Sequence, residues 1–326
     1  IYSVYPMKTV VAYPTEFTIN VVSAQNLTKF SWNFGDNTTE VVTTGNKTTH
    51  SYASTGAYNL RVQVTDKRNL SAYRIFLINV SSPANWINSE LNEINKSIRD
   101  LEREISPFDS FYQEALKSSL NLDYLKGRVV YLRARYQNAT SDSQYGEIVA
   151  ELLEVIKQIP EGIYKSGSTP PGGVALLSGP DYVNLDVLKE IGGGSYKSNQ
   201  EEDYINAALF WQSENLDVNL DFSEFSERDQ GTLSPLVRIF EINIDKKKDI
   251  TSDYYLILPE LEGFNSDSQF SNKSGYIYIN LKNKNSVSFS TTENINPTNL
   301  PAFISPAISE LSIIEVAPPE PPTISK

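Results

Sequence analysis

His50 is the only histidine in the chain and so the first residue to test for acid–base chemistry. A serine hydrolase places histidine between a nucleophilic serine and a carboxylate, but no serine here lies in a Gly-X-Ser-X-Gly turn. A histidine-rich zinc site would need a second histidine. Because the chain has no cysteine, thiolate metal sites, thiol nucleophiles and disulfides are also excluded. We therefore expect no hydrolytic centre built on this residue.

Acidic side chains gather at two places where paired carboxylates could line a glycosidase cleft. The two groups are Glu201, Glu202 and Asp203, and Asp221, Glu224 and Glu227. Such clusters are more often wetted surface than catalytic machinery. We interpret the chain as a non-catalytic protein.

Oxygen ligands that suit calcium occur in two predicted loops, Asn265 to Ser268 and Asp245 to Asp253. Neither loop follows the EF-hand pattern, so calcium stays an open alternative without named ligands, and no other cofactor is expected. Three successive glycines, Gly192 to Gly194, lack the Lys-Ser/Thr that follows in a phosphate-binding loop. The three glycines therefore predict a flexible turn and no nucleotide-binding site.

Nineteen tyrosines are more than buried cores alone would need. Tyr254, Tyr255, Tyr276 and Tyr278 could form a surface row that stacks on sugars or on a partner protein. The alternation along the second pair predicts that Tyr276 and Tyr278 face the wetter side of a strand. The alternative is that the four tyrosines are cross-strand pairs.

Eight Asn-X-Ser/Thr sequons, none with proline in the middle, are candidate glycosylation sites. They are Asn26, Asn37, Asn46, Asn69, Asn79, Asn95, Asn138 and Asn272. Most lie in the first half of the chain at predicted turns, which favours a glycosylated exterior.

The N-terminal residues predict short strands of a β-sandwich. Phe30, Trp32 and Phe34 alternate with polar residues, and the stretch Tyr58 to Val64 does the same. Each strand therefore has one apolar face, and the two strands need a shared core.

A motif in these strands gives a family resemblance. Its elements, in order, are Trp32, Phe34, Gly35, Asp36, His50, Tyr52, Gly56 and Tyr58. Residues 1–82 resemble the PKD (polycystic kidney disease) domain family, which implies an immunoglobulin-like sandwich found in secreted and cell-surface proteins. Asn33 and Asn37 depart from the usual Trp-Asp-Phe-Gly-Asp-Gly pattern. The turn should survive because asparagine tolerates the left-handed conformation.

Helical periodicity replaces strand alternation from Trp86 onward. Residues spaced four and three apart form a heptad seam: Ile87, Leu91, Ile94, Ile98, Leu101 and Ile105. Two further stripes follow, from Leu122 to Tyr136 and from Ile148 to Ile159. They predict a helical bundle or a hairpin spacer, with a seam that could instead exchange with a neighbouring subunit.

Strand signals return after a Gly-, Pro- and Ser-rich boundary at Ser166 to Gly173 and a short helix within Val183 to Ile191. The strand candidates are Ala208–Trp211, Val218–Phe222, Leu236–Ile244, Tyr254–Leu258, Tyr276–Leu281, Val287–Ser290 and Leu311–Val316. A second β-sandwich is the economical interpretation. The whole is a multidomain, mainly β chain with an α insert. Its expected parts are 1–82, a PKD-like sandwich; 83–164, a helical or coiled-coil spacer; 165–317, a second sandwich; and 318–326, a Pro-rich linker.

Charge and hydropathy limit the partners. A formal net charge of −12 would repel a phosphate backbone, so no nucleic-acid partner is expected. No apolar run reaches the roughly 18 residues that cross a bilayer. Because the chain opens at Ile1 without an initiator Met and its tail has the composition of a Pro-rich linker, we expect flanking segments that supply any anchor to membrane or cell wall.

These features predict an archaeal or bacterial surface protein that works by contact. It would be an S-layer, filament or adhesin component whose partners are other surface proteins, its own copies or cell-surface glycans. The alternative is the substrate-attachment region of a secreted hydrolase whose catalytic domain lies elsewhere.

Glycosylation makes the first testable prediction. The intact mass of protein isolated from its native source should exceed the mass of the bare polypeptide, because at least two sequons carry sugar. Agreement between the two masses would remove the inference.

Overall fold

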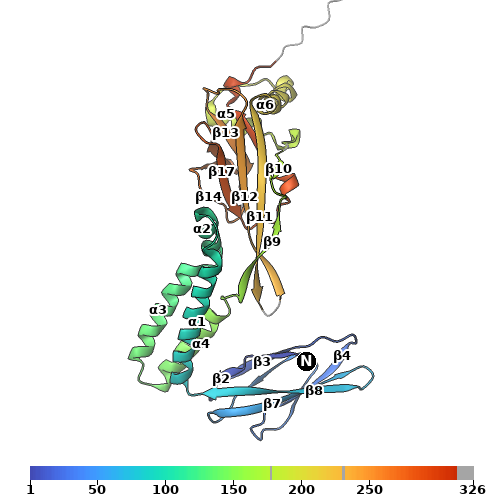
Figure 1. Cartoon of the computed structure of the whole chain (residues 1–326), viewed down its shortest axis with the longest axis vertical. Helices are drawn as coiled ribbons and strands as arrows, with labels where there is room; N and C mark the ends of the chain where they lie inside the picture. The colour runs from blue at the N-terminus through green and yellow to red at the C-terminus, as the bar shows by residue number, and fades with distance from the viewer. Residues whose placement is uncertain (177, 230–231, 314–326) are drawn as a thin grey trace, which may run out of the picture. The chain divides into compact units, whose positions relative to one another are not determined.

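The computed structural model describes residues 1–176, 178–229 and 232–313 (Figure 1). The proline-rich segment 318–326 lies outside these residues. Backbone contacts divide the chain into two compact units, Ile1–Asp100 with Asp123–Ile159, and Leu101–Leu122 with the chain from Pro160 onward. The division into three modules and a linker remains a prediction.

Eight strands build the N-terminal module. They are β1 (Ser3–Tyr5), β2 (Lys8–Val10), β3 (Thr15–Asn20), β4 (Leu27–Asn33), β5 (Val41–Thr43), β6 (Lys47–His50), β7 (Gly56–Asp66) and β8 (Ser71–Ser81). They form a three-stranded sheet, β1-β3-β6, and a five-stranded sheet, β2-β8-β7-β4-β5. The β2–β8 pair is parallel and the other pairs are antiparallel.

One apolar core joins the two sheets of this module. Phe17 and Ile19 enter it from the three-stranded sheet, and Trp32, Val62 and Ile78 enter it from the five-stranded sheet. All five side chains are fully buried, and each stabilises the module by about 1.5–3 kcal/mol. The predicted β-sandwich is confirmed.

Three helices follow: α1 (Pro83–Ile105), α3 (Leu122–Asn138) and α4 (Asp142–Ile156). Every residue of the predicted α1 seam is buried, and α1 ends directly before Ser106 and Pro107. Arg133 of α3 donates a hydrogen bond to Asn92 of α1, and Arg135 of α3 pairs with Glu147 of α4. The α insert is therefore a bundle in which α3 bonds to both of its neighbours.

The remaining elements form a larger module. They are α2 (Ser110–Ser119), β9 (Gly162–Ser168), β10 (Val174–Ala175), α5 (Leu185–Gly192), α6 (Glu201–Asn215), β11 (Leu216–Asp229), β12 (Thr232–Lys246), β13 (Tyr254–Pro259), β14 (Asn265–Ser266), β15 (Ser271–Lys273), β16 (Tyr276–Asn280), β17 (Ser286–Thr291) and β18 (Phe303–Pro306). Six strands form one sheet, β10-β11-β12-β17-β14 with β9 paired to β11, and four form another, β15-β16-β13-β18.

The two sheets of this module enclose a core of their own. Leu220, Phe240 and Phe289 from the six-stranded sheet meet Leu256 and Ile279 from the four-stranded sheet. This pairing confirms the second β-sandwich.

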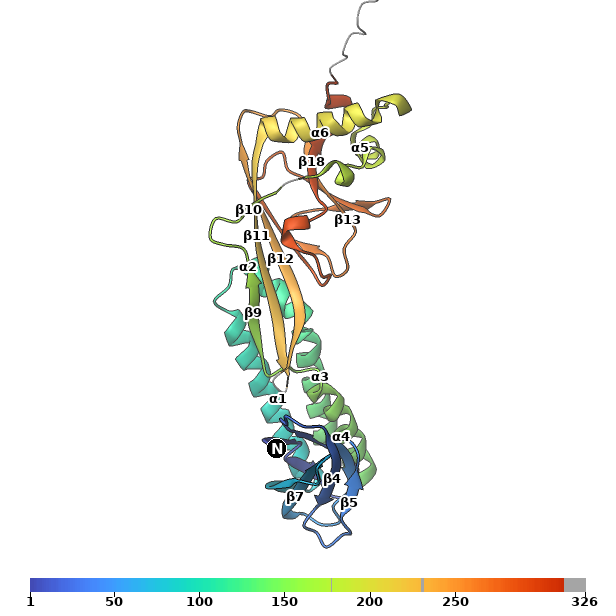
Figure 2. The ribbon, with the colours of Figure 1, turned by 90° about the vertical axis from the view of Figure 1, so that its right-hand side faces the viewer.

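A further apolar cluster covers the other face of the four-stranded sheet. There Ile257 and Phe303 contact Leu188 of α5 and Ala208 of α6. Figure 2 shows both helices at the same end of this module as β18.

Two strand predictions in this region are wrong. Ala208–Trp211 lies within α6, because the apolar run belongs to a longer segment that packs as a helix on the four-stranded sheet. Leu311–Ile313 is not a strand, and the rest of that candidate lies outside the described residues. The start of the stretch predicted as a boundary, Ser166 to Gly173, overlaps β9, which continues to Ser168. No helix of the described residues is long and apolar enough to span a bilayer.

Gly35 makes a prediction about the first sandwich. Its φ is +75°, and a Cβ built there would lie 2.6 Å from the carbonyl oxygen of Asn59. Gly35→Ala should therefore destabilise the module by at least about 2 kcal/mol, from backbone strain and steric overlap together. Hydrogen exchange of β4 and β7 amides, read by mass spectrometry, measures the loss. The control is Gly45→Ala, where an added Cβ meets nothing within 4 Å; equal protection in both variants would contradict the argument.

Candidate functional site

The polar motif residues of the N-terminal module meet in the turn after β4. The backbone N–H of Gly35 donates to Asn33 Oδ1 at 3.0 Å, and the Thr38 hydroxyl donates to Asp36 Oδ1 at 2.6 Å. His50 Nε2 lies 2.7 Å from Asp36 Oδ2, and the two side chains are only 11% and 9% exposed. The histidine and the carboxylate are thus paired with each other inside the turn.

Aromatic rings pack against the side chains of this turn. The His50 ring stacks on Phe34 with centroids 3.8 Å apart, and Tyr52 meets both rings edge-on. The Tyr52 hydroxyl donates to the carbonyl oxygen of Phe34, and Tyr58 stacks on Tyr52. Trp32 donates its indole N–H to Thr43 at 3.1 Å. These contacts give the motif side chains structural partners within the sandwich.

The ionised form of Asp36 is favoured in this setting. Burial raises the pKa of its carboxyl, but hydrogen bonds from Thr38 and His50 outweigh burial and leave the pKa below its ordinary value. Burial and the nearby Asp36 charge raise the pKa of Tyr52, which therefore stays a neutral phenol. The turn thus contains a fixed negative charge whose oxygens accept hydrogen bonds from within the turn.

The candidate carboxylates lie on two separate elements, α6 and β11. Glu201, Glu202 and Asp203 occupy the exposed first turn of α6, where negative charge stabilises the helix. On β11, the Asp221 carboxylate accepts hydrogen bonds from Thr169 and Asn243.

Glu224, three residues beyond Asp221 on β11, forms an ion pair. It pairs with the buried guanidinium of Arg238 at 2.6 Å. Asp221 and Glu224 leave the strand on opposite sides. Burial, followed by the charge of Asp229, raises the pKa of Glu227. Nothing in these contacts orients two carboxylates across a shared cleft.

The two calcium loops use their oxygens locally. Asp267 Oδ2 accepts a hydrogen bond from the backbone N–H of Ser288, and the Ser266 hydroxyl donates to the carbonyl oxygen of Ser288. The first loop is therefore bonded to β17. In the other loop Asp253 pairs with Lys282 at 3.0 Å. Among the described residues, no group of three or more His, Asp or Glu side chains could hold a metal ion.

The four tyrosines do not form a surface row, so that prediction is wrong. Tyr254 is fully buried in the sandwich core. Tyr255, Tyr276 and Tyr278 pack against the cluster under α5 and α6, on the opposite side of the sheet. Tyr255 and Tyr278 make the edge-to-face contact of the alternative reading, with centroids 6.1 Å apart. The wetter face expected for Tyr276 and Tyr278 is covered because two helices pack on it.

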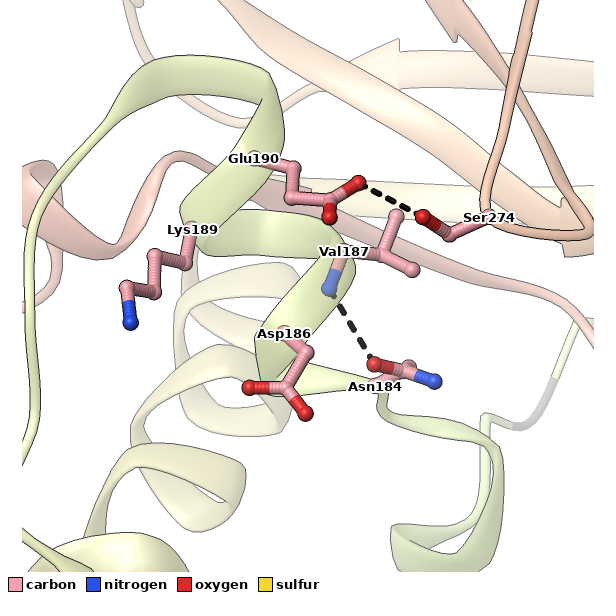
Figure 3. Close-up of a pocket in the computed structure, with 6 residues that line it drawn as sticks. All are labelled: Asn184, Asp186, Val187, Lys189, Glu190 and Ser274. Carbon is pink, nitrogen blue, oxygen red and sulfur yellow. Dashed lines mark hydrogen bonds between the residues drawn. The ribbon is translucent and has the colours of Figure 1, made fainter.

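A hollow of about 570 Å³ lies beside α5 (Figure 3). Ser274 donates to the Glu190 carboxylate at 2.9 Å, and Asn184 Oδ1 accepts the Val187 N–H at 3.1 Å as the helix cap. Asp186 accepts a hydrogen bond from Tyr196. Sequence reasoning missed this hollow because its lining comes from two segments that only the fold brings together.

Comparison with known proteins decides the family of the first module. Residues 2–79 match the family model described as PKD domain. This segment is a PKD domain. The motif geometry above is therefore the interior of an immunoglobulin-like PKD domain.

The other comparisons add little. No curated protein matches the chain. A solved structure described as "Structural basis for the promiscuous specificity of the carbohydrate-binding modules from the beta-sandwich super family" is 10% identical, with 91% of this chain and 86% of that chain covered. Its TM-score is 0.24, too low to support an argument.

Five of the eight sequons lie in the PKD domain. Seven of the eight asparagines are exposed, and Asn95 on α1 is partly buried. Asn37 and Asn69 sit at turns with φ of 65° and 59°. Asn79 lies within β8 and Asn272 within β15. Their glycosylation remains a prediction.

The Asp36 carboxylate makes a pH prediction for the PKD domain. Because the folded pKa is below the unfolded value of about 3.9, its stabilisation is complete above that value and is lost as the pH falls through the folded pKa. Asp36→Asn should lower the free energy of unfolding by about 1–3 kcal/mol at pH 7. The difference from wild type should vanish at strongly acidic pH. Calorimetric midpoints from pH 7 to pH 2 measure it.

The matched control is Asp123→Asn. Its side chain is 96% exposed and 3.6 Å from Lys126, so the change should cost less than about 0.5 kcal/mol at pH 7. Equal losses in both variants would show that the pairing inside the turn does not stabilise the domain.

Proposed function

We propose that this chain is an extracellular, non-catalytic protein of a prokaryotic cell surface, an S-layer, filament or adhesin component that acts through contacts with proteins or glycans. The PKD domain at residues 2–79 carries the proposal. Its motif supports it, because the sole histidine and its carboxylate partner are bonded to each other and not available to a substrate.

The module order fits this role. Two sandwiches and a helical bundle present rigid surfaces, and repeated weak contacts between many copies can sum to strong attachment. The sequons on the exposed PKD turns are compatible with an exterior location. Partners would be other surface proteins, copies of this chain or cell-surface glycans, and no nucleic acid.

A second candidate rests on the same PKD domain. The chain would be the substrate-attachment region of a secreted hydrolase, with the hollow beside α5 as a place for a polar ligand. In that case a catalytic domain would occur on the same polypeptide.

Immunogold labelling of intact source cells with antibodies to the folded chain tests the proposal. Dense labelling of the cell exterior is expected. Label confined to the medium, on a polypeptide that also carries a catalytic domain, would favour the hydrolase role. Label found only in the cytoplasm would overturn both. Permeabilised cells, which expose internal antigen, provide the control.

A further inference from the structure

One face of the PKD domain carries an exposed apolar row. Along β8, Phe76, Ile78 and Val80 point into the core, and the intervening residues point outward. The outward row is Tyr73, Ile75 and Leu77, which are 61%, 53% and 54% exposed. Single exposed apolar residues are common, whereas contiguous exposed apolar patches mark interaction surfaces, and these three side chains follow one another on the same side of one strand. We call this row and the outward side chains of β7 and β4 beside it the β8 face.

The β8 face is cationic. Arg61 of β7 pairs in register with Ile75, and its guanidinium lies 4.5 Å from the centroid of the Tyr73 ring. Lys29 of β4 faces the same side. It pairs in register with Thr65 of β7, and Thr65 pairs with Ser71, which lies on the outward side of β8.

The carboxylates of residues 1–82 lie elsewhere. They are Glu16 on the other sheet, Asp36 in the turn after β4, Glu40 before β5 and the inward-facing, buried Asp66. The β8 face therefore combines apolar area with positive charge.

The net charge of the chain is also unevenly divided, with a basic PKD domain and an acidic remainder. Residues 1–82 contain seven Lys or Arg and four Asp or Glu, a net charge of +3. The remaining 21 Lys or Arg and 36 Asp or Glu give residues 83–326 a net charge of −15. The complement of the β8 face is thus present on every copy of the chain, outside the PKD domain.

We propose that the β8 face docks on the acidic part of a second copy, within residues 83–326, so that copies associate head to tail. The inference deepens the assembly form of the proposed function. A face-to-face dimer through β8 is disfavoured, because it would bring the Arg61 and Lys29 charges of both copies together. A head-to-tail contact is heterologous, and repetition of it produces rings or open filaments.

The same geometry bears on Asn79. This sequon lies two residues beyond Leu77 on the same side of β8, so a glycan there would cover the end of the apolar row. Asn79 should therefore be free of sugar in assembled protein, as peptide mapping by mass spectrometry can show. Full occupancy in assembled material would overturn the proposal.

Sedimentation velocity of the full chain over a concentration series gives the main test. Wild type should associate, and its apparent Kd should rise at least tenfold between 50 mM and 500 mM salt because ionic contacts are screened. At low salt, Arg61→Glu and, separately, Ile75→Thr should each weaken association about tenfold or more. Two variants that remove different contacts guard against a folding defect in either.

Matched controls lie on the same domain, off the β8 face. Lys67→Glu reverses a charge in the turn between β7 and β8, and Val22→Thr changes a side chain that is 83% exposed. Both should keep the wild-type Kd within about twofold.

Three outcomes would overturn the inference. If wild type associates but the β8 variants and the controls behave alike, the docking surface is wrong while the proposed surface role stands. A wild type that stays monomeric at every concentration and salt also overturns it, and immunogold labelling then judges the surface role separately. A monomer that binds the acidic polysaccharide polygalacturonate, and loses it in Arg61→Glu, would assign the face to a glycan.

Discussion

Successive side chains along a β-strand leave the backbone on opposite sides, and both sandwiches depend on this constraint. It sends Trp32, Val62 and Ile78 into the PKD core. In the larger module it separates two neighbours on β13, since Tyr254 enters the sandwich core and Tyr255 faces the cluster under α5 and α6. Where such an alternating strand lacks a covering layer, as along β8, the same rule leaves apolar side chains in solvent. Core and exposed surface are thus two results of one geometry.

The fold was predictable where periodicity was long and unmixed. The seven-residue repeat of α1 and the alternation of β4 and β7 are read directly from the sequence, and the motif around Trp32 identified the family. Prediction failed where tertiary contacts decide. The run Ala208–Trp211 is short enough to suit a strand, and only its packing against β18 explains the helix. The covered tyrosines were missed for a similar reason, because no local pattern reveals that helices pack on a sheet face.

Several polar side chains of types that could act in catalysis or metal binding form structural contacts within the fold. Asp36 and His50 bond to each other, Glu224 bonds to the buried Arg238, and Asp267 bonds to the backbone of β17. A sequence can show which residues are capable of chemistry, but their partners depend on register and turn geometry.

The stacked turn of the PKD domain also provides a natural spectroscopic reporter. The chain has one imidazole, and its ring lies parallel to that of Phe34 at 3.8 Å. The circulating electrons of the phenyl ring shift the imidazole C–H resonances upfield from their ordinary positions, and no second histidine contributes lines of the same kind. One pair of lines would then follow the state of a single domain inside a chain of 326 residues, without isotope labels or an introduced fluorophore.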